Sequence, residues 1–459
     1  MREETGRTMK KLSEDTSSYL FSNQALRKLI APLIIEQFLA VFVGLADSIM
    51  VASAGEAAVS GVSMMDTVFV LLINIFAALA TGGAVVSGQS LGRKKPEEAC
   101  RATTQLFLFV GVLSVAVMAG IYLCKNWILY GLFGDAEAEV ISSCRTYLLI
   151  VGASIPFLAI YNAGAATFRA MGNSKISMYV SLLMNAINIG GNGIFIYGMG
   201  WGVAGAALPT LVSRIFAGVG MVVLLRNQSH PLHLPKPFRF HFEGWMLKKI
   251  LHIGVPNGVE NSMFQLGKIL VLSIVAGFGT ASTAANAVCN NLAMFQTLPG
   301  IAMGYATLSV TAQCVGAGDY KQTRYYKRKL MRLTYLFILI SSLILVALLP
   351  FIIWLYNLSA EASQMTEKIM WSHTAFCILI WPLSFTLPNV LRAANDVRYC
   401  MILSIASMWI FRVFCSKIFG VDLGLGVLGI WFAMYLDWAV RSLGFVVRYA
   451  RGKWEHIRL

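Results

Sequence analysis

The stretch LIAPLIIEQFLAVFVGLADSIMVAS, residues 29–53, decides the fold because it is long enough to cross a bilayer as one helix. About 20 apolar residues at ~1.5 Å each span a hydrocarbon core of about 30 Å. The stretch nevertheless contains Glu36 and Asp47, although a charged group near the centre of a membrane helix costs about 2.5–3.5 kcal/mol. Their eleven-residue spacing returns to within about 20° of one helix face. We therefore predict that both acids face the interior of the protein.

The composition of the whole chain indicates a membrane protein. Its 459 residues are 57% hydrophobic and 13% charged, whereas soluble proteins carry about 25% charged residues. The apolar runs lack strict alternation, which predicts an all-α polytopic fold. The formal net charge of +15 comes from short basic clusters between apolar runs, which favours contact with membrane lipids and not nucleic acid. The eight cysteines include no Cys-x-x-Cys pair, so we expect no cysteine metal site or disulfide framework.

The apolar runs predict twelve transmembrane helices, and the basic residues fall on alternate connections between them. Short loops rich in Lys and Arg are typical of the cytoplasmic side. We therefore expect a multi-pass protein of the plasma membrane with both termini in the cytoplasm. The expected helices are 29–53, 62–88, 103–124, 141–168, 176–197, 203–225, 250–276, 285–311, 332–353, 366–391, 399–418 and 426–447.

Several motifs recur along the chain at a nearly constant spacing. Three of them repeat after 224 residues: Pro32 to Glu36 as Pro256 to Glu260, Val51-Ala52 as Val275-Ala276, and Gln89 with Gly92 as Gln313 with Gly316. This repeat predicts two pseudo-symmetric six-helix lobes that face each other across a cleft. The expected parts are a cytoplasmic tail over 1–28, an N-lobe over 29–225, a linker over 226–249, a C-lobe over 250–447 and a second tail over 448–459.

Four polar residues of the predicted N-lobe share one depth in the membrane. Asp47 lies about 9 Å from the outer end of its helix, and Thr210 lies at about 10 Å. Asn185, Asn188 and Asn192 fall on one face of another helix. A carboxylate beside amide and hydroxyl oxygens can bind a proton or a sodium ion, so Asp47, Asn188, Asn192 and Thr210 form the predicted cation or proton site. The alternative is that the Asn and Thr side chains only form hydrogen bonds between neighbouring helices.

Other ionisable residues in the apolar runs are further candidates. Glu260 matches Glu36 in the repeat and is the C-lobe candidate for binding a cation or the substrate, although both acids could instead accept hydrogen bonds beside the preceding proline. Glu36, Asn185 and Asp66 are weaker candidates for the first site. Asp437 and Arg441, four residues apart, are expected to neutralise each other. Arg412 could be a cavity charge or a snorkelling residue.

Several segments also resemble a known family, the multidrug and toxic compound extrusion (MATE) transporters. They are LADSIMVASAG (45–55), NIGGNGIFIYG (188–198) followed by GVAGAALPT (202–210), and FRAMGNSK (168–175), echoed by LRAANDVR (391–398). The chain is most similar to the bacterial branch related to DNA-damage-inducible membrane proteins. The resemblance implies a secondary antiporter that exports lipophilic organic cations and other small-molecule drugs in exchange for H+ or Na+, with no other cofactor. We expect the protein to be monomeric.

The resemblance also assigns residues to the site. The family's coupling positions correspond to Asp47, Asn188 and Thr210. The family usually has a second acid four residues after that asparagine, where this chain has Asn192. The departure implies that Asp47 carries at most one proton or one sodium ion.

Two other classes of protein are alternatives to the antiporter. A lipid-linked precursor flippase of the same superfamily remains the alternative, although flippases commonly have more than twelve helices. A membrane-embedded enzyme would need clustered catalytic side chains, whereas His230, His233 and His241 lie in the predicted linker. We therefore expect a transporter that is not an enzyme.

Overall fold

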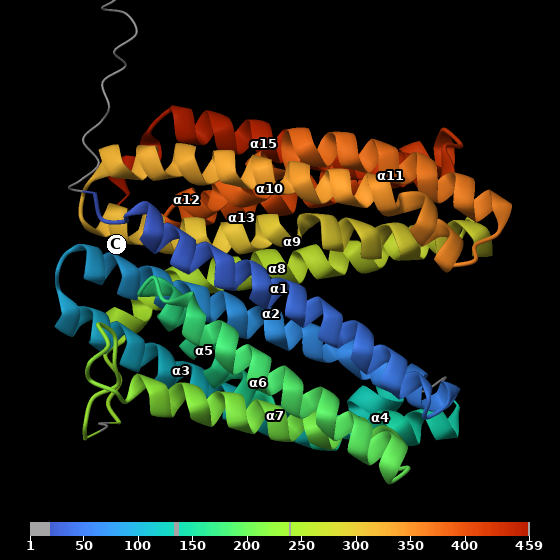
Figure 1. Ribbon diagram of the computed structural model, residues 1–459, viewed down its shortest axis with the longest axis horizontal. Coiled ribbons are helices and arrows are strands. Elements are labelled where there is room, and N and C mark those ends of the chain that lie inside the picture. Colours follow the sequence, from blue (N-terminus) through green and yellow to red (C-terminus); the bar gives the residue numbers. More distant parts are fainter. Residues whose placement is uncertain (1–18, 133–136, 238–239, 458–459) are drawn as a thin grey trace, which may run out of the picture.

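The computed structural model describes residues 19–132, 137–237 and 240–457, and within these ranges the chain folds into helices joined by short connections (Figure 1). The first half of the chain contains α1 (Asn23–Ala52), α2 (Glu56–Gly92), α3 (Pro96–Leu123), α4 (Ala138–Gly152), α5 (Ile155–Ala170), α6 (Ser174–Asn192) and α7 (Gly202–Leu225). The second half contains α8 (Gly244–Ala276), α9 (Thr280–Gly316), α10 (Tyr320–Leu355), α11 (Ala360–Trp381), α12 (Leu387–Ala393), α13 (Val397–Ser407), α14 (Cys415–Lys417) and α15 (Gly426–Ala450). Wider π-helical turns occur at 127–132, 193–198, 382–386, 408–414 and 418–422, and a 3-10 turn follows α15 at Lys453–His456.

The prediction of an all-helical polytopic membrane protein is confirmed. Within the described residues, ten helices are long and apolar enough to cross a membrane, and α4 with α5 makes an eleventh if that bent pair is one span. The sequence predicted one helix over 141–168, but the chain bends there by 50°. The bend lies just before Pro156, in the first turn of α5. Proline has no N–H to continue the hydrogen bonds of α4, and it disfavours a helical conformation at the preceding residue.

The remaining predicted span, 285–311, lies inside α9. This helix has 37 residues, so it is long enough, but it is not apolar enough to count as a span by composition. Twenty-three of its residues are buried, including Asn286, Gln296 and Thr307. These three polar side chains therefore lie against other helices and not against lipid, which allows α9 to be less apolar than its neighbours.

Local sequence signals explain where several helices begin. Ser22 accepts a hydrogen bond from the Ala25 amide at the start of α1, and Asp319 accepts one from Gln322 at the start of α10. Such caps satisfy amides that have no partner inside the helix. The helices α2 and α9 instead follow Gly55 and Gly279, whose φ angles of 106° and 91° disfavour any side chain. A glycine with positive φ thus precedes the helix at two positions that are 224 residues apart, in agreement with the repeat.

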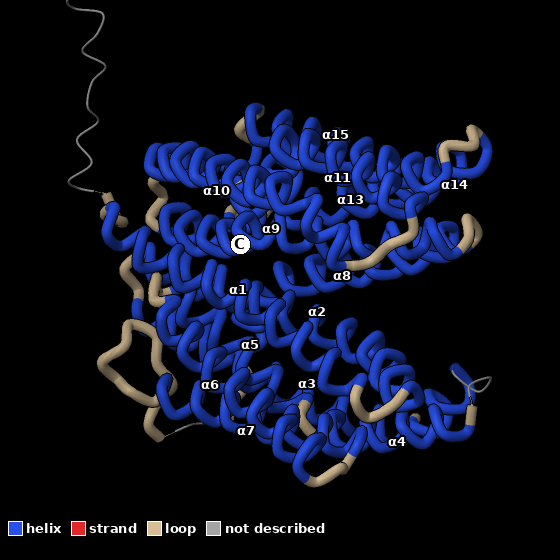
Figure 2. Tube along the Cα trace, turned by 45° about the vertical axis from the view of Figure 1, so that its right-hand side comes forward, coloured by secondary structure: helices blue, strands red, loops and turns tan. Residues whose placement is uncertain are grey.

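The helices of the two halves form two groups that meet along α1, α2, α8 and α9 (Figure 1). We call one end of the molecule the basic end; it contains the α2–α3 and α7–α8 connections and the C-terminus, on the left of Figure 1. The two groups lie close together there and diverge toward the opposite end (Figure 2). The linker expected over 226–249 is shorter, since α8 begins at Gly244. Residues 1–18 of the expected N-terminal tail and residues 458–459 of the C-terminal tail lie outside the described residues, and α1 already begins at Asn23.

Reciprocal contacts join the two halves at the basic end. Gln89 of α2 donates to the carbonyl oxygen of Ala393 at 2.8 Å, and Gln313 of α9 donates to that of Ala170 at 2.6 Å. The backbones touch at Gly92, where a Cβ would lie 1.9 Å from the Gln313 carbonyl oxygen. The repeat therefore produces a matched pair of hydrogen bonds across the interface between the halves.

Candidate functional site

A cavity of about 700 Å³ lies in the first half of the chain, with Tyr305 of α9 contributing from the second half. All seven polar residues that the sequence proposed for the N-lobe line it: Glu36, Asp47, Asp66, Asn185, Asn188, Asn192 and Thr210. They come from α1, α2, α6 and α7, which the helix pattern alone could not place beside one another. The structure therefore brings the whole predicted N-lobe set together around one space.

Asp47 is held by the two asparagines of α6. The Asn192 amide donates to Asp47 Oδ1 at 2.7 Å. With its nitrogen toward the carboxylate, the Asn188 amide donates to Asp47 Oδ1 at 2.7 Å and Oδ2 at 3.1 Å, and its oxygen accepts from the Thr210 hydroxyl at 3.0 Å. Asn188 and Asn192 are buried. Hydrogen bonds to an ionised group are among the stronger ones in proteins, so this carboxylate is fixed in position at the cavity wall.

Asp66 and Arg214 complete the charged wall beside Asp47. The Tyr147 hydroxyl donates to Asp66 Oδ1 at 3.1 Å. Arg214 donates to the Ser154 hydroxyl at 2.8 Å, and its charge interacts with those of both Asp47 and Asp66. Arg214 was not among the site residues predicted from the sequence. Its signal was a lone arginine in the middle of the apolar run 203–225, one helical turn after Thr210.

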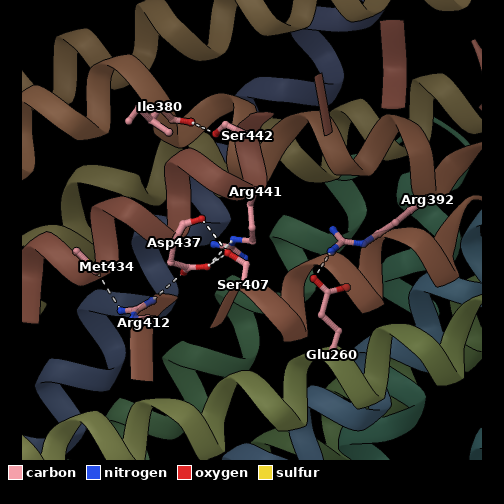
Figure 3. Close-up of polar contacts among 9 residues, drawn as sticks. All are labelled: Glu260, Ile380, Arg392, Ser407, Arg412, Met434, Asp437, Arg441 and Ser442. Carbon is pink, nitrogen blue, oxygen red and sulfur yellow. Dashed lines mark hydrogen bonds and ion pairs between the residues drawn. The ribbon is translucent and has the colours of Figure 1, made fainter. Parts of the chain in front are cut away.

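Glu36 and Glu260 form equivalent ion pairs in the two halves. Arg169 lies 3.5 Å from Glu36, which also accepts a hydrogen bond from Ser177 at 2.9 Å. Arg392 lies 2.7 Å from Glu260 (Figure 3). Both glutamates are buried, and the sequence had assigned both arginines to loops. Glu260 does not line the 700 Å³ cavity, but Arg392 lines a neighbouring cavity of about 230 Å³ between the halves. The role of Glu260 in binding stays a prediction.

Asp437 and Arg441 contact each other as the sequence predicted. Arg441 Nε lies 3.4 Å from Asp437 Oδ1, which also accepts a hydrogen bond from Ser407 at 2.6 Å. Arg412 approaches the other carboxylate oxygen at 4.0 Å, and its side chain is only 12% exposed (Figure 3). Of the two alternatives for Arg412, the structure shows the interior charge and not the snorkelling residue.

The 700 Å³ cavity is suited to positively charged, partly apolar molecules. Three carboxylates and two guanidinium groups line it, together with Tyr147, Tyr161 and Tyr305. An excess of negative charge raises the local concentration of cations, and aromatic faces attract them. Among the described residues no group of three or more His, Cys, Asp and Glu side chains could hold a metal ion. A charged cavity inside a membrane-spanning bundle built from two repeated helical halves is typical of a membrane transporter.

The comparison with protein families agrees with this class. The MatE family model matches residues 32–194 and 256–417, two segments whose first residues are 224 positions apart, as in the sequence repeat. The chain therefore belongs to the MatE family of MATE transporters and is not an enzyme. The family resemblance seen in the sequence is confirmed, whereas no finding distinguishes the DNA-damage-inducible branch.

The chain is also similar to individual proteins over most of its length. It is 27% identical over 444 residues to the uncharacterized transporter YisQ of Bacillus subtilis, covering 94% of each chain. It is 27% identical over 412 residues to the probable multidrug resistance protein YoeA of the same organism, covering 87% of each chain. A solved outward-facing structure of a multidrug resistance MATE transporter superposes with a TM-score of 0.86 at 20% identity, covering 93% of this chain and 95% of that one. This likeness supports the fold.

Proposed function

We propose that this transporter exports lipophilic organic cations in exchange for H+ or Na+ across the plasma membrane, with both termini in the cytoplasm. The observation that carries the proposal is the Asp47 carboxylate, bonded by Asn188 and Asn192 at the wall of a 700 Å³ cavity. The name of the YoeA relative, a probable multidrug resistance protein, agrees with a drug as cargo. We place the chain in the DNA-damage-inducible branch on its sequence motifs alone.

Asp47 provides the coupling because one carboxylate can take either a proton or a cation. Proton binding neutralises the charge that attracts an organic cation, so ion and cargo compete for one group. A sodium ion would need oxygen ligands, and those at hand are the Asp47 carboxylate, the Thr210 hydroxyl and Asn192 Oδ1, which is buried without a partner. Coupling then requires ion and cargo to have different affinities in the two states of the transporter.

The contacts at the basic end support alternating access. The Gln89 and Gln313 hydrogen bonds close the molecule there, and the helix groups diverge at the other end (Figure 2). With the basic end in the cytoplasm, this arrangement corresponds to a state open to the outside. Rocking of the N-lobe (29–225) against the C-lobe (250–447) would break these bonds and expose the cavity to the cytoplasm.

The proposal is tested by measuring drug accumulation in cells that lack their own efflux pumps. Asp47→Asn should abolish export of ethidium, whereas Ser48→Ala, which changes a neighbouring residue of the cavity wall, should export like the parent. Collapsing the sodium and proton gradients separately identifies the coupling ion. Normal export by Asp47→Asn would exclude Asp47 as the coupling residue, and lipid scrambling in liposomes without drug export would favour the flippase.

A further inference from the structure

A small pocket in the second half occupies the place that the Asp47 site occupies in the first half. Its volume is about 210 Å³, and it lies among α8, α9, the π-helical turn at 408–414, and α15. Nine residues line it, and subtracting 224 from their numbers gives, in eight cases, a residue that lines the 700 Å³ cavity. The two pockets are therefore equivalent in the repeat, although the sequence repeat alone did not reveal the second one.

The charge of the second pocket is the reverse of the first. Asp47 and Asp66 of the first site are replaced by uncharged residues, and two of its uncharged residues are replaced by cations. The equivalent pairs are Asp47 and Val271, Asp66 and Asn290, Gly44 and Lys268, and Asn188 and Arg412. Among the residues that the structure describes, no carboxylate lines the second pocket.

The two cations of this pocket are poorly neutralised by the surrounding protein. Arg412 lies 4.0 Å from Asp437, a carboxylate that Arg441 already approaches at 3.4 Å (Figure 3). Lys268 has no ion pair among the described residues, and its Nζ lies 5.2 Å from the centre of the Phe264 ring. Arg412 contacts the same ring at 5.3 Å. Excess charge at membrane depth is unfavourable by about 2.5–3.5 kcal/mol per residue unless a partner is present.

We propose that this pocket binds a monovalent anion, held between the Lys268 ammonium and the Arg412 guanidinium. Its volume suits a carboxylate group or a chloride ion, and not a whole drug molecule. Residue Lys268 is exposed and lines the pocket, so a ligand can reach it. The two sources of the anion are the carboxylate of an amphiphilic molecule and free chloride. This inference does not depend on Asp47 as the coupling residue.

Anion binding can be measured on the purified full-length protein in a maltoside detergent, with a large sulfonate as the only other anion. Octanoate, chloride and uncharged octanol are titrated while the melting temperature is followed by tryptophan fluorescence. We expect a saturable rise in melting temperature with an anion and none with octanol. A rise with octanoate alone identifies an amphiphilic carboxylate, whereas a rise with chloride that octanoate competes with identifies the free anion.

Two variants and a control assign the effect to the pocket. Lys268→Gln should weaken anion binding at least about tenfold, since hydrogen bonds to charged groups contribute about 1.5–3 kcal/mol. Asn290→Asp introduces the acid of the equivalent position beside Lys268 and should weaken binding similarly without removing either cation. Lys249→Gln changes another lysine of α8, outside the pocket, and should bind like the parent. No anion effect in the parent, or an effect that both pocket variants retain, would overturn the proposal.

Discussion

Asn192 of α6 donates a 2.7 Å hydrogen bond to Asp47 of α1, although 145 residues separate them in the chain. The bond links the predicted ion-binding acid to the position where related transporters usually carry a second acid. It holds the Asp47 carboxylate at the cavity wall, and within the described part of the chain the amide oxygen of Asn192 is buried without a hydrogen-bond partner. A change at Asn192 should therefore alter ion binding more directly than cargo binding.

Asn192→Ala should change the apparent affinity for the coupling ion by about tenfold, because it removes a hydrogen bond to a charged group worth about 1.5–3 kcal/mol. A proton should bind more tightly, since ionised Asp47 loses a donor, whereas Na+ should bind more weakly, since the Asn192 amide oxygen is lost as a ligand. The measurement is the ion dependence of drug uptake into proteoliposomes. Asn185→Ala is the matched control, because Asn185 lines the same cavity but its hydrogen bond goes to Ser181 at 3.5 Å. Equal ion dependence in both variants would argue against a role for Asn192.

Arg214→Gln should strengthen the binding of organic cations several-fold. Arg214 repels a cation beside Asp47 and Asp66, and its removal leaves the two acids less neutralised. Binding of tetraphenylphosphonium to purified protein measures the effect. Weaker binding in this variant would show that Arg214 mainly supports the structure of the cavity, for which its hydrogen bond to Ser154 is the visible contact.

Removing one partner of the Glu260–Arg392 pair should destabilise the protein by about 3 kcal/mol, because a buried charge is left without its partner. Arg392→Met tests this by thermal or denaturant unfolding in detergent. The pair Arg324–Glu455 is the control, since its arginine side chain is 53% exposed and Arg324→Met should cost at most about 1 kcal/mol. If Glu260→Gln restores the stability of Arg392→Met but not its transport, Glu260 has a role beyond structure.

Gly92→Val should shift the transporter away from the state closed at the basic end. A side chain at Gly92 would clash with the Gln313 carbonyl oxygen, which lies 1.9 Å from the Cβ position. At the equivalent Gly316, the Cβ position lies 2.0 Å from the Gln89 carbonyl oxygen. Distances between spin labels on the basic ends of α2 and α9 should increase. Gly220→Val should leave the distance unchanged, because among the described residues no atom outside its own stretch of helix backbone lies within 4 Å of the added Cβ. An unchanged distance in Gly92→Val would exclude this contact as a closing element.

Much of the candidate site could be predicted because its signals are local in sequence. A carboxylate such as Asp47 in an apolar run is conspicuous, and helix geometry assigns Asn188 and Asn192 to one face at one depth. The constant offset of 224 residues likewise required only the sequence. Arg214 was missed although its signal was equally local, whereas Arg169 and Arg392 were assigned to loops because basic residues near helix ends ordinarily face the cytoplasm.

The sequence by itself determined the apolar helices, the repeat and the acids that must face an interior, since hydropathy and helical periodicity are properties of each segment alone. Only the tertiary structure decided which groups meet. It paired Glu260 with Arg392, set Asn192 on Asp47, and placed Lys268 and Arg412 in a pocket equivalent to the acidic one. These contacts join residues more than 100 positions apart, and their geometry depends on how whole helices pack, which no local pattern contains.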